Sequence, residues 1–227
     1  MPAEISVIVP TLDAAEQLPD CLAALIEGLS AGLIRELIVT DGGSRDDSRR
    51  IADAAGAVIV TGDASRGGQL RRGVALARGR WLLVLHADTT LEPGWAAAVA
   101  QHLQSGQGQA AYFRLAFRAR GLMPVWVAGW ANLRARLFGL PFGDQGLLLR
   151  RDVYERAGGY PDQPLMEDVA LVQALDSAPV VLSARAFTSA EKYRRTGWLR
   201  RGLRNLWTLA RYFAGVDPQR LAASYRR

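Results

Sequence analysis

The sequence predicts an α/β protein built on a mostly parallel central sheet, with an amphipathic helix near its C-terminus. The first observation is a regular alternation of short β-branched runs and helical segments over the first 85 residues, which is typical of a parallel sheet with crossover helices. The second is that polar clusters follow three of these strands, where open α/β sheets bind their ligands. The third is the helical spacing of apolar residues from Trp198 to Phe213.

The first half of the chain supplies four strands and three helices. Ile5 to Pro10 is a short β-branched run that a proline ends, which predicts a buried strand. The elements predicted after it are a helix over 15–29, a strand over 36–40, a helix over 46–55 capped by Ser44 or Asp46, a strand over 57–60, a helix over 68–77 and a strand over 81–85.

The second half has a looser pattern. Within 122–140, Trp126, Trp130, Leu133 and Leu137 recur at helical spacing, which predicts a helix. The other predicted elements are helices over 95–103, 153–157, 167–175 and 198–213, and strands over 110–118, 146–150 and 180–182.

Composition favours one globular domain. The chain has 227 residues, of which 49% are hydrophobic and 22% charged, so a substantial core can form. Cys21 is the only cysteine and lies among leucines, which predicts a buried thiol and excludes an internal disulfide. The N-terminus lacks the pattern of a secretory signal. Both features predict a cytoplasmic protein.

The positive charge is concentrated at the C-terminus. Residues 185–227 carry 11 basic and two acidic residues, whereas residues 1–184 carry 17 basic and 20 acidic. Because the larger part is slightly acidic and has no recognition motif, we expect no nucleic-acid partner. Lys192 is the only lysine, and the other basic residues are arginines, whose planar side chains suit phosphate.

Three polar clusters, at 10–13, 41–44 and 86–89, follow predicted strands. Each alone is compatible with a plain turn, because Asp, Gly, Ser and Pro favour turns. Together they place carboxylates at one edge of the sheet, which turn chemistry does not require.

These clusters also carry a family resemblance. The segments SVIVPTLDAA, IVTDGGSRDDS, ARGRWLLVLHADT and GDQGLLLRRDVYERAGGYPDQPLMEDVAL resemble family 2 glycosyltransferases over residues 4–175. The resemblance implies the GT-A fold, a Rossmann-like three-layer α/β architecture. It also implies a nucleotide-diphosphate sugar donor, a hydroxyl acceptor, inversion at the anomeric carbon and a divalent ion, Mg²⁺ or Mn²⁺.

The resemblance assigns the donor site to strand ends. Asp41 matches the acid that contacts the base, and Arg66, in the loop before the third helix, matches a basic residue near the nucleotide. Asp88 matches an acid of the Asp-x-Asp element, which binds the metal and the diphosphate. The backbone expected to flank the base belongs to Pro10, Thr11 and Leu12.

His86 departs from the family pattern, because it stands where the first aspartate of that element is usual. A neutral imidazole could bind Mn²⁺, ribose or phosphate, or His86 could be structural. The change leaves open a metal-independent enzyme in which arginines stabilise the leaving group.

The acceptor site is expected around Glu167 and Asp168. Asp168 matches the family's catalytic base, which takes the proton of the acceptor hydroxyl. The alternative is an acidic first turn that complements the helix dipole. Asp144 and Gln145 lie in a candidate acceptor-side loop, for which a plain glycine turn is the alternative.

The basic tail allows three interpretations. The helix over 198–213 could lie on an anionic membrane, assisted by Trp126 and Trp130, which would suit a lipid acceptor at the inner face of the membrane. Its apolar stripe could instead pack on the domain and leave its arginines in solvent. Arg194 and Arg195 could also fold over the donor diphosphate.

We therefore expect one domain with a nucleotide-binding half (1–92), an acceptor-binding half (93–184) and a basic helical tail (185–227). Two other functions remain open. A nucleotidyltransferase would need a Gly-rich basic loop after the first strand, for which only 65–68 is a weak substitute. His86 and the amphipathic tail also suit an inactive membrane-surface or scaffold protein of the same fold.

Overall fold

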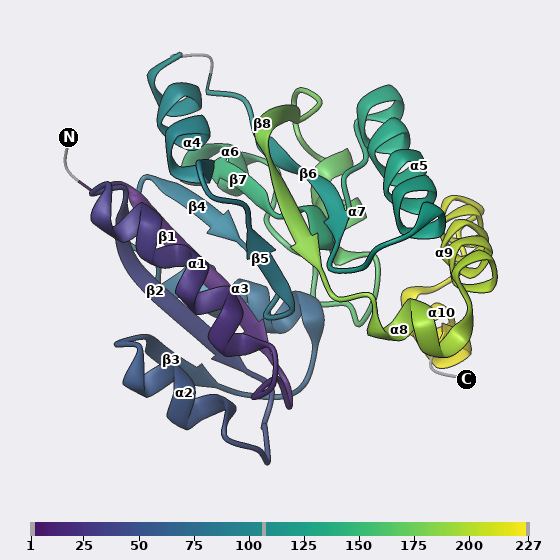
Figure 1. Cartoon of the computed structure of the whole chain (residues 1–227), viewed down its shortest axis with the longest axis horizontal. Helices are drawn as coiled ribbons and strands as arrows, with labels where there is room; N and C mark the ends of the chain where they lie inside the picture. Colours follow the sequence, from purple (N-terminus) through teal and green to yellow (C-terminus); the bar gives the residue numbers. More distant parts are fainter. Residues whose placement is uncertain (1–2, 106–107, 226–227) are drawn as a thin grey trace.

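The structure is a computed structural model that describes residues 3–105 and 108–225. Its centre is an eight-stranded sheet with the order β3-β2-β1-β4-β7-β6-β8-β5 (Figure 1). Strands β1 to β4 are parallel, β6 is parallel to β8, and β7 and β5 run antiparallel to their neighbours. The predicted α/β fold with a mostly parallel sheet is therefore confirmed.

The strands lie close to the predicted positions in most cases. They are β1 (Ile5–Thr11), β2 (Ile34–Asp41), β3 (Val58–Thr61), β4 (Trp81–Val84), β5 (Thr89–Leu91), β6 (Ala111–Phe117), β7 (Leu147–Arg150) and β8 (Val180–Thr188).

The helices include every one that the sequence predicted. They are α1 (Leu18–Ser30), α2 (Ser48–Ala54), α3 (Arg66–Leu76), α4 (Trp95–Gln104), α5 (Leu122–Phe138), the short 3₁₀ helix η1 (Gly143–Gln145), α6 (Arg151–Arg156), α7 (Glu167–Gln173), α8 (Glu191–Thr196), α9 (Trp198–Phe213) and α10 (Pro218–Tyr225).

Two apolar cores, one on each face of the sheet, make the fold three-layered. Alternate side chains of a strand point to opposite faces, so Val7 of β1 packs with α1 and α4 while Ile8 packs with α3, α6 and α7. Cys21 of α1 is buried in the first core, as the sequence predicts.

Strand register brings the polar clusters to one edge. In the parallel pairing of β1 with β2, Thr11 lies beside Asp41, and Ile8 of β1 lies beside Val84 of β4. The segments that follow β1, β2 and β4 therefore leave the sheet at the same side. This is the edge that the sequence predicted for the site.

Some local predictions need correction. Arg66 is the first residue of α3 rather than a loop residue, because Ser65 caps the helix by accepting a hydrogen bond from the Gly68 N–H at 3.3 Å. Helix α2 begins later than predicted, at Ser48. Strand β8 continues to Thr188, where it pairs with the unpredicted β5. Helices η1, α8 and α10 were also not predicted, and each of the four missed elements offers too few periods for a clear signal.

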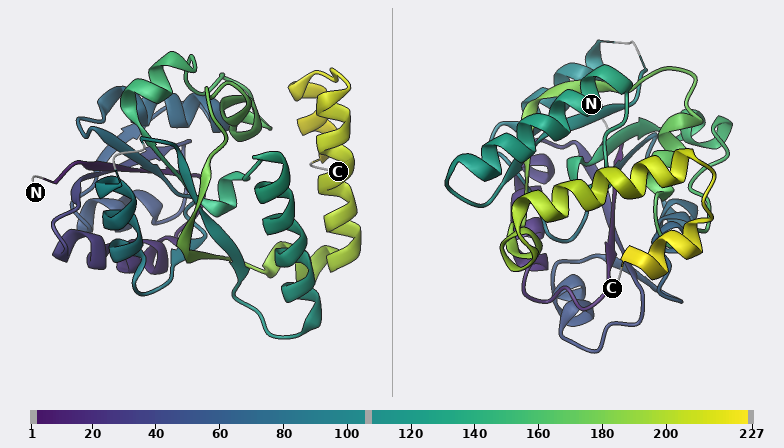
Figure 2. Two further views of the ribbon diagram at one scale, coloured as in Figure 1. Left: turned by 90° about the horizontal axis from the view of Figure 1, so that it is seen from above. Right: turned by 90° about the vertical axis from the view of Figure 1, so that its right-hand side faces the viewer.

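Helix α9 lies beside α5 at the end of the molecule that is far from β3, and its orientation was not predicted (Figures 1 and 2). Leu203 and Trp207 are 66% and 65% exposed, whereas Arg201 and Arg204 are half-buried. The interpretation in which the apolar stripe packs on the domain and the arginines are solvated is therefore wrong for most of the helix.

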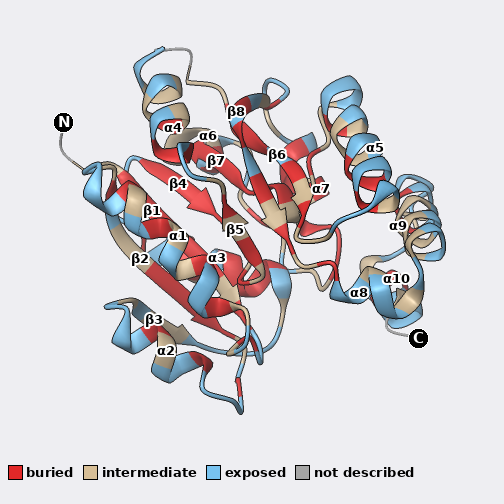
Figure 3. Ribbon diagram, viewed as in Figure 1, coloured by how far each residue is buried: buried red, intermediate tan, exposed pale blue. Residues whose placement is uncertain are grey.

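Helix α5 is also apolar on its outer side. Much of α5 and α9 is exposed (Figure 3). Trp126 is 60% exposed, and Leu122, Leu137 and Phe138 are exposed as well, so α5 and α9 together present an apolar surface. A groove of about 830 Å³ runs between the two helices. Within the described ranges, no helix has both the length and the apolar character needed to cross a membrane.

Candidate active site

Two connected hollows lie at the predicted edge of the sheet. The large cavity, of about 730 Å³, lies over the ends of β1 and β4, and the inner pocket, of about 130 Å³, lies between η1 and α7. Both are lined by Arg66, His86, Asp88 and Lys192, so they form one continuous site. Asp168 and Asp144 line the inner pocket.

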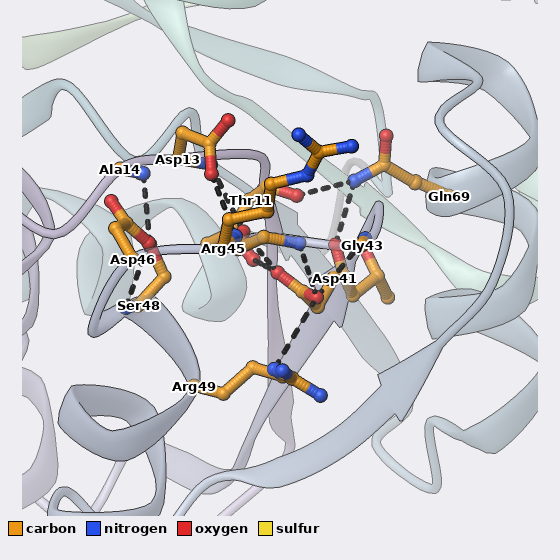
Figure 4. Close-up of polar contacts among 12 residues, drawn as sticks. Thr11, Asp13, Ala14, Asp41, Gly43, Arg45, Asp46, Ser48, Arg49 and Gln69 are labelled. Atoms are coloured by element: carbon orange, nitrogen blue, oxygen red, sulfur yellow. Dashed lines mark hydrogen bonds and ion pairs between the residues drawn. The ribbon is translucent and has the colours of Figure 1, made fainter.

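Asp41 is fully buried, and its carboxylate is surrounded by polar contacts (Figure 4). Its Oδ1 accepts hydrogen bonds from the backbone N–H groups of Gly43 (3.1 Å) and Ser44 (2.9 Å), and its Oδ2 accepts from the Thr11 and Ser44 hydroxyls. Asp41 is not among the described residues that line either hollow. Asp41 therefore joins the end of β1 to the loop that follows β2.

The end of β1 and the start of the loop after it form one wall of the large cavity. Pro10, Thr11 and Leu12, which were predicted to flank the base, all line this cavity. Gln69 of α3 fixes this wall, because its side-chain amide donates 2.8 Å hydrogen bonds to the carbonyls of Thr11 and Thr40. Sequence reasoning missed Gln69, although it directly follows the glycine pair that comes after Arg66.

Arg66 stands where α3 begins, is exposed and lines both hollows. The residue after it must be small, because a Cβ at Gly67 would lie 1.8 Å from the Pro161 carbonyl oxygen. The Ser65 hydroxyl also donates a 2.6 Å hydrogen bond to Asp162. The start of α3 is thus attached to the segment that leads into α7.

Glu167 is 2% exposed and borders the large cavity rather than the inner pocket. Within the described residues, its Oε2 has no hydrogen-bond partner. Burial, with a smaller contribution from Asp168, raises the pKa of Glu167 to about 7, and Arg66 opposes the rise. The carboxyl group is therefore protonated in a substantial fraction of molecules near neutral pH.

His86 and Asp88 lie where the chain leaves β4. The carbonyl of His86 accepts hydrogen bonds from the Cys21 thiol (3.6 Å) and the Thr89 N–H (3.0 Å), and Arg118 donates to the Asp88 carbonyl (3.0 Å). Burial lowers the pKa of the His86 imidazole, against a smaller opposing effect of Asp88. His86 is thus a neutral imidazole at pH 7.

Lys192 of α8 reaches Asp88 across the site, with 3.8 Å between its Nζ and Oδ2 of the carboxylate. The sequence singled it out only as the one lysine in the chain. Its position near Asp88 had no sequence signal, because α8 belongs to the tail and Asp88 follows a central strand.

The chain itself offers few ligands for a divalent cation. Asp88 supplies a carboxylate and His86 a neutral imidazole, but the ammonium group of Lys192 lies beside the same carboxylate. In the described ranges, no group of three or more His, Cys, Asp or Glu side chains could hold a metal ion. These residues do not fit a resident Mg²⁺ or Mn²⁺ ion, which favours several oxygen ligands.

Asp168 projects into the inner pocket from the start of α7. The backbone N–H of Gly143 donates to its Oδ2 at 2.6 Å, and the N–H of Val169 donates to its Oδ1 at 2.8 Å. A Cβ at Gly143 would lie 2.5 Å from His86 Nε2, so glycine allows η1 to approach both His86 and Asp168. The glycine loop is therefore part of the site rather than a plain turn.

Asp144 and Gln145 were predicted together on the acceptor side, but their side chains lie in different surroundings. Asp144 lines the inner pocket, and burial raises the pKa of its carboxyl to about 6, opposed by Arg134. Gln145 is fully buried and donates to the carbonyl of Phe113 at 3.3 Å. As the last residue of η1 it attaches this short helix to β6, and it is outside the described lining of both hollows.

Backbone strain coincides with the site. Of the described non-glycine residues, Asp13 and Met166 have positive φ, 49° and 64°. Asp13 lines the large cavity and Met166 the inner pocket. Such conformations cost on the order of 1 kcal/mol or more and concentrate at functional sites. Met166 directly precedes Glu167 and Asp168, so this strained turn sets the direction in which both acidic side chains leave the backbone.

The tail closes the site with basic residues. Lys192, Arg195, Arg201 and Arg204 line the large cavity. Arg194, predicted beside Arg195, is not among the described residues that line either hollow. Sequence reasoning placed Arg201 and Arg204 on the polar side of α9 and did not propose them for the site.

Comparison with known proteins agrees with this architecture. The model of the family described as "Glycosyl transferase family 2" matches residues 6–139, which is more than half of the chain. A PGL/p-HBAD biosynthesis glycosyltransferase of Mycobacterium tuberculosis is 38% identical over 93 residues, covering 38% of this chain and 36% of that protein. A TPR repeat-containing protein of Synechococcus elongatus is 40% identical over 91 residues, covering 39% of this chain and 21% of that protein. The chain thus matches about a third or less of the length of these relatives.

Solved structures share the fold. Residues 1–349 of S. aureus TarS align with a TM-score of 0.65 at 13% identity, covering 91% of this chain and 64% of that chain. Glucosyl-3-phosphoglycerate synthase from Mycobacterium tuberculosis, solved with Mn²⁺, uridine diphosphate and phosphoglyceric acid, aligns with a TM-score of 0.53 at 24% identity. That alignment covers 79% of this chain and 68% of the synthase.

Proposed function

This chain belongs to glycosyl transferase family 2, and from that premise we propose that it moves a sugar from a nucleoside-diphosphate donor to an acceptor hydroxyl. The observation that carries the proposal is the continuity of the site: Asp88 and Asp168, which come from different halves of the chain, line one inner pocket. A donor diphosphate beside Asp88 and an acceptor beside Asp168 would then meet within this pocket.

The proposed reaction is a single displacement with inversion. The acceptor oxygen attacks the anomeric carbon and forms the new C–O bond, while the bond from that carbon to the diphosphate oxygen breaks. Asp168 takes the proton of the acceptor hydroxyl, and the nucleoside diphosphate leaves with the electron pair. The N–H groups of Gly143 and Val169 hold the carboxylate of Asp168 in place for this step.

The nucleotide is proposed to bind in the large cavity. Its base would lie against the loop from Pro10 to Leu12, which Asp41 and Gln69 hold from below. Contact of the base with Asp41 itself remains a prediction. Because Asp41 is fully buried, the segment from Pro10 to Leu12 would have to move to expose it. A Mg²⁺ or Mn²⁺ ion would have to arrive with the donor, because Asp88 and His86 supply only two ligands.

We propose a division of labour along the chain. Residues 1–92 bind the nucleotide, and residues 93–184 contribute the acceptor side through Asp144 and Asp168. The tail, residues 185–227, contributes to donor binding in this proposal, because Lys192 and three arginines of the tail line the large cavity.

We also propose that the apolar surface of α5 and α9 docks on an anionic membrane. Three exposed tryptophans, Trp126, Trp130 and Trp207, lie on this surface, and tryptophan favours the membrane interface. From Arg114 to Gly143 the sequence has five arginines and no acid, and Arg114, Arg120 and Arg136 among them are exposed, so the surroundings of α5 complement anionic lipid. A lipid acceptor would fit such a location.

The function is tested by screening UDP-, GDP- and dTDP-sugars by thermal shift and then assaying transfer or hydrolysis of those that bind. We expect at least one donor to raise Tm and to be turned over. Binding of lipid vesicles without turnover of any donor would favour the scaffold function. Release of pyrophosphate from a nucleoside triphosphate and a sugar phosphate would favour a nucleotidyltransferase.

A further inference from the structure

Arg201 and Arg204 of α9 line the large cavity. They are held by a brace of three side chains, Tyr193, Asn205 and Tyr225. The Arg201 guanidinium donates a 3.1 Å hydrogen bond to the Tyr225 hydroxyl and lies 5.5 Å from the centre of the Tyr193 ring. The Tyr225 hydroxyl donates to Asn205 at 2.8 Å, and the Asn205 amide donates to the Tyr193 hydroxyl at 3.1 Å. The three tail helices α8, α9 and α10 each contribute one residue to this brace.

Arg204 is placed beside Arg201 by the same brace. Its guanidinium lies 4.8 Å from the centre of the Tyr225 ring. Its Nε–H is buried without a hydrogen-bond partner among the described residues. A buried donor that is left unpaired costs free energy. Arg204 also lines the large cavity, so its guanidinium group borders the space that the donor would occupy.

Lys192 belongs to the same lining. Its ammonium lies 3.8 Å from the Asp88 carboxylate, whose negative charge it partly neutralises. The ammonium group therefore weakens the attraction of Asp88 for a divalent ion, whereas it attracts an anionic diphosphate.

The charge of the large cavity is positive. Its described lining includes five cationic side chains, Arg66, Lys192, Arg195, Arg201 and Arg204, and three carboxyl groups, Asp13, Asp88 and Glu167. Because Glu167 is partly protonated at neutral pH, the excess of positive charge is larger than the residue count indicates. Arginine and lysine form charge-assisted hydrogen bonds with phosphate oxygens.

We propose that Lys192, Arg201 and Arg204 form a cationic clamp that binds the donor's diphosphate without requiring a divalent ion. The inference rests on the proposed function and names how its leaving group is held. The clamp residues contact the diphosphate and stabilise the negative charge that it gains as the sugar departs. The brace keeps both arginines in position before the donor arrives, which reduces the entropic cost of binding.

Binding of inorganic pyrophosphate tests the clamp, because pyrophosphate has the chemistry of the diphosphate and no base or sugar. We expect isothermal titration calorimetry to detect binding of pyrophosphate and of UDP or GDP in EDTA. We expect added Mg²⁺ or Mn²⁺ to change the Kd of the nucleotide by less than about threefold. Lys192→Ala, Arg201→Ala and Arg204→Ala should each weaken binding in EDTA by about tenfold or more.

Arg200→Ala is the matched control, since Arg200 lies on the same helix, is exposed and is outside the described lining of both hollows. It should retain the wild-type Kd. Arg201 also contacts Tyr193 and Tyr225 of the tail, so Arg201→Ala could weaken binding by destabilising the fold. A thermal melt of each variant and the charge-conserving variant Arg201→Lys separate the two effects. Arg201→Lys should keep the wild-type Tm and part of the affinity.

The outcomes separate the clamp from the function. Nucleotide that binds only when Mg²⁺ or Mn²⁺ is present overturns the clamp and leaves the proposed function standing. Wild-type affinity in folded Lys192→Ala and Arg201→Ala proteins likewise overturns the clamp alone. If neither pyrophosphate nor any nucleoside diphosphate binds with or without metal, both proposals are wrong.

Discussion

The backbone N–H of Gly143 donates a 2.6 Å hydrogen bond to Oδ2 of Asp168, and this contact joins η1 to the first turn of α7. It fixes the carboxylate at the wall of the inner pocket, close to the His86 imidazole. A carboxylate that acts as a general base must be oriented as well as ionised. The contact explains why a glycine loop distant in sequence belongs to the same site as Asp168.

Asp168→Asn tests the proposed base. The amide keeps the shape of the side chain but cannot accept the proton, so we expect kcat to fall by about 10²–10⁴-fold, with little change in the Kd of the donor. Steady-state transfer assays and calorimetry with the donor measure the two effects. Asp176→Asn, an exposed aspartate on another surface, is the control, and wild-type transfer by Asp168→Asn would refute the assignment.

Gly143→Ala tests the close approach of η1. The added Cβ would lie 2.5 Å from His86 Nε2 and 3.5 Å from Asp168 Oδ2, so η1 or His86 must move. We expect a lower kcat together with a lower Tm. Gly129→Ala in α5 is the matched control: its Cβ meets nothing within 4 Å, and alanine in a helix should raise stability by about 0.5–1 kcal/mol. Equal kcat and Tm in Gly143→Ala and the wild type would contradict the packing described for η1.

Glu167→Gln tests the buried carboxyl group. A carboxyl whose folded-state pKa is raised binds its proton more tightly when folded, so the free energy of unfolding falls as pH rises from 4.5 through about 7. Gln removes this titration, and the variant should gain stability relative to the wild type between pH 5 and pH 8, by at most about 3 kcal/mol. Urea unfolding at the two pH values measures the difference. Glu155→Gln, at an exposed position, is the control and should show no such pH-dependent gain in the free energy of unfolding. If the difference between Glu167→Gln and the wild type did not change with pH, burial would not raise the pKa of Glu167.

Substitutions on the outer face of α9 test membrane docking. Leu203→Ser with Trp207→Ser should abolish flotation with anionic vesicles while leaving the Tm almost unchanged, because both side chains are exposed. Ile26→Ser on α1, at another exposed apolar position, should still float. Failure of the wild-type protein to float with anionic vesicles at low salt would count against a membrane partner.

The central fold could be predicted because its signals are local. β-branched runs predicted β1, β2 and β3, and the register of parallel strands then made it certain that the segments after them share an edge. His86 and Asp88 could be located for the same reason, since they follow a strand. Asp168 was singled out by the family resemblance, because an acidic first turn of a helix has a plain alternative. The short elements β5, α8 and α10 could not be predicted, because a few residues give too few periods for a pattern.

The sequence by itself determined which residues lie at the edge of the sheet and that α9 has one apolar and one basic side. Only the tertiary structure decided which side faces inward: Arg201 and Arg204 turn toward the cavity and Leu203 and Trp207 toward solvent. The physical reason is that helical periodicity separates two faces but carries no information on what each face meets. The contact between Lys192 and Asp88 was likewise decided by the tertiary structure, since it depends on how α8 folds back over the end of β4.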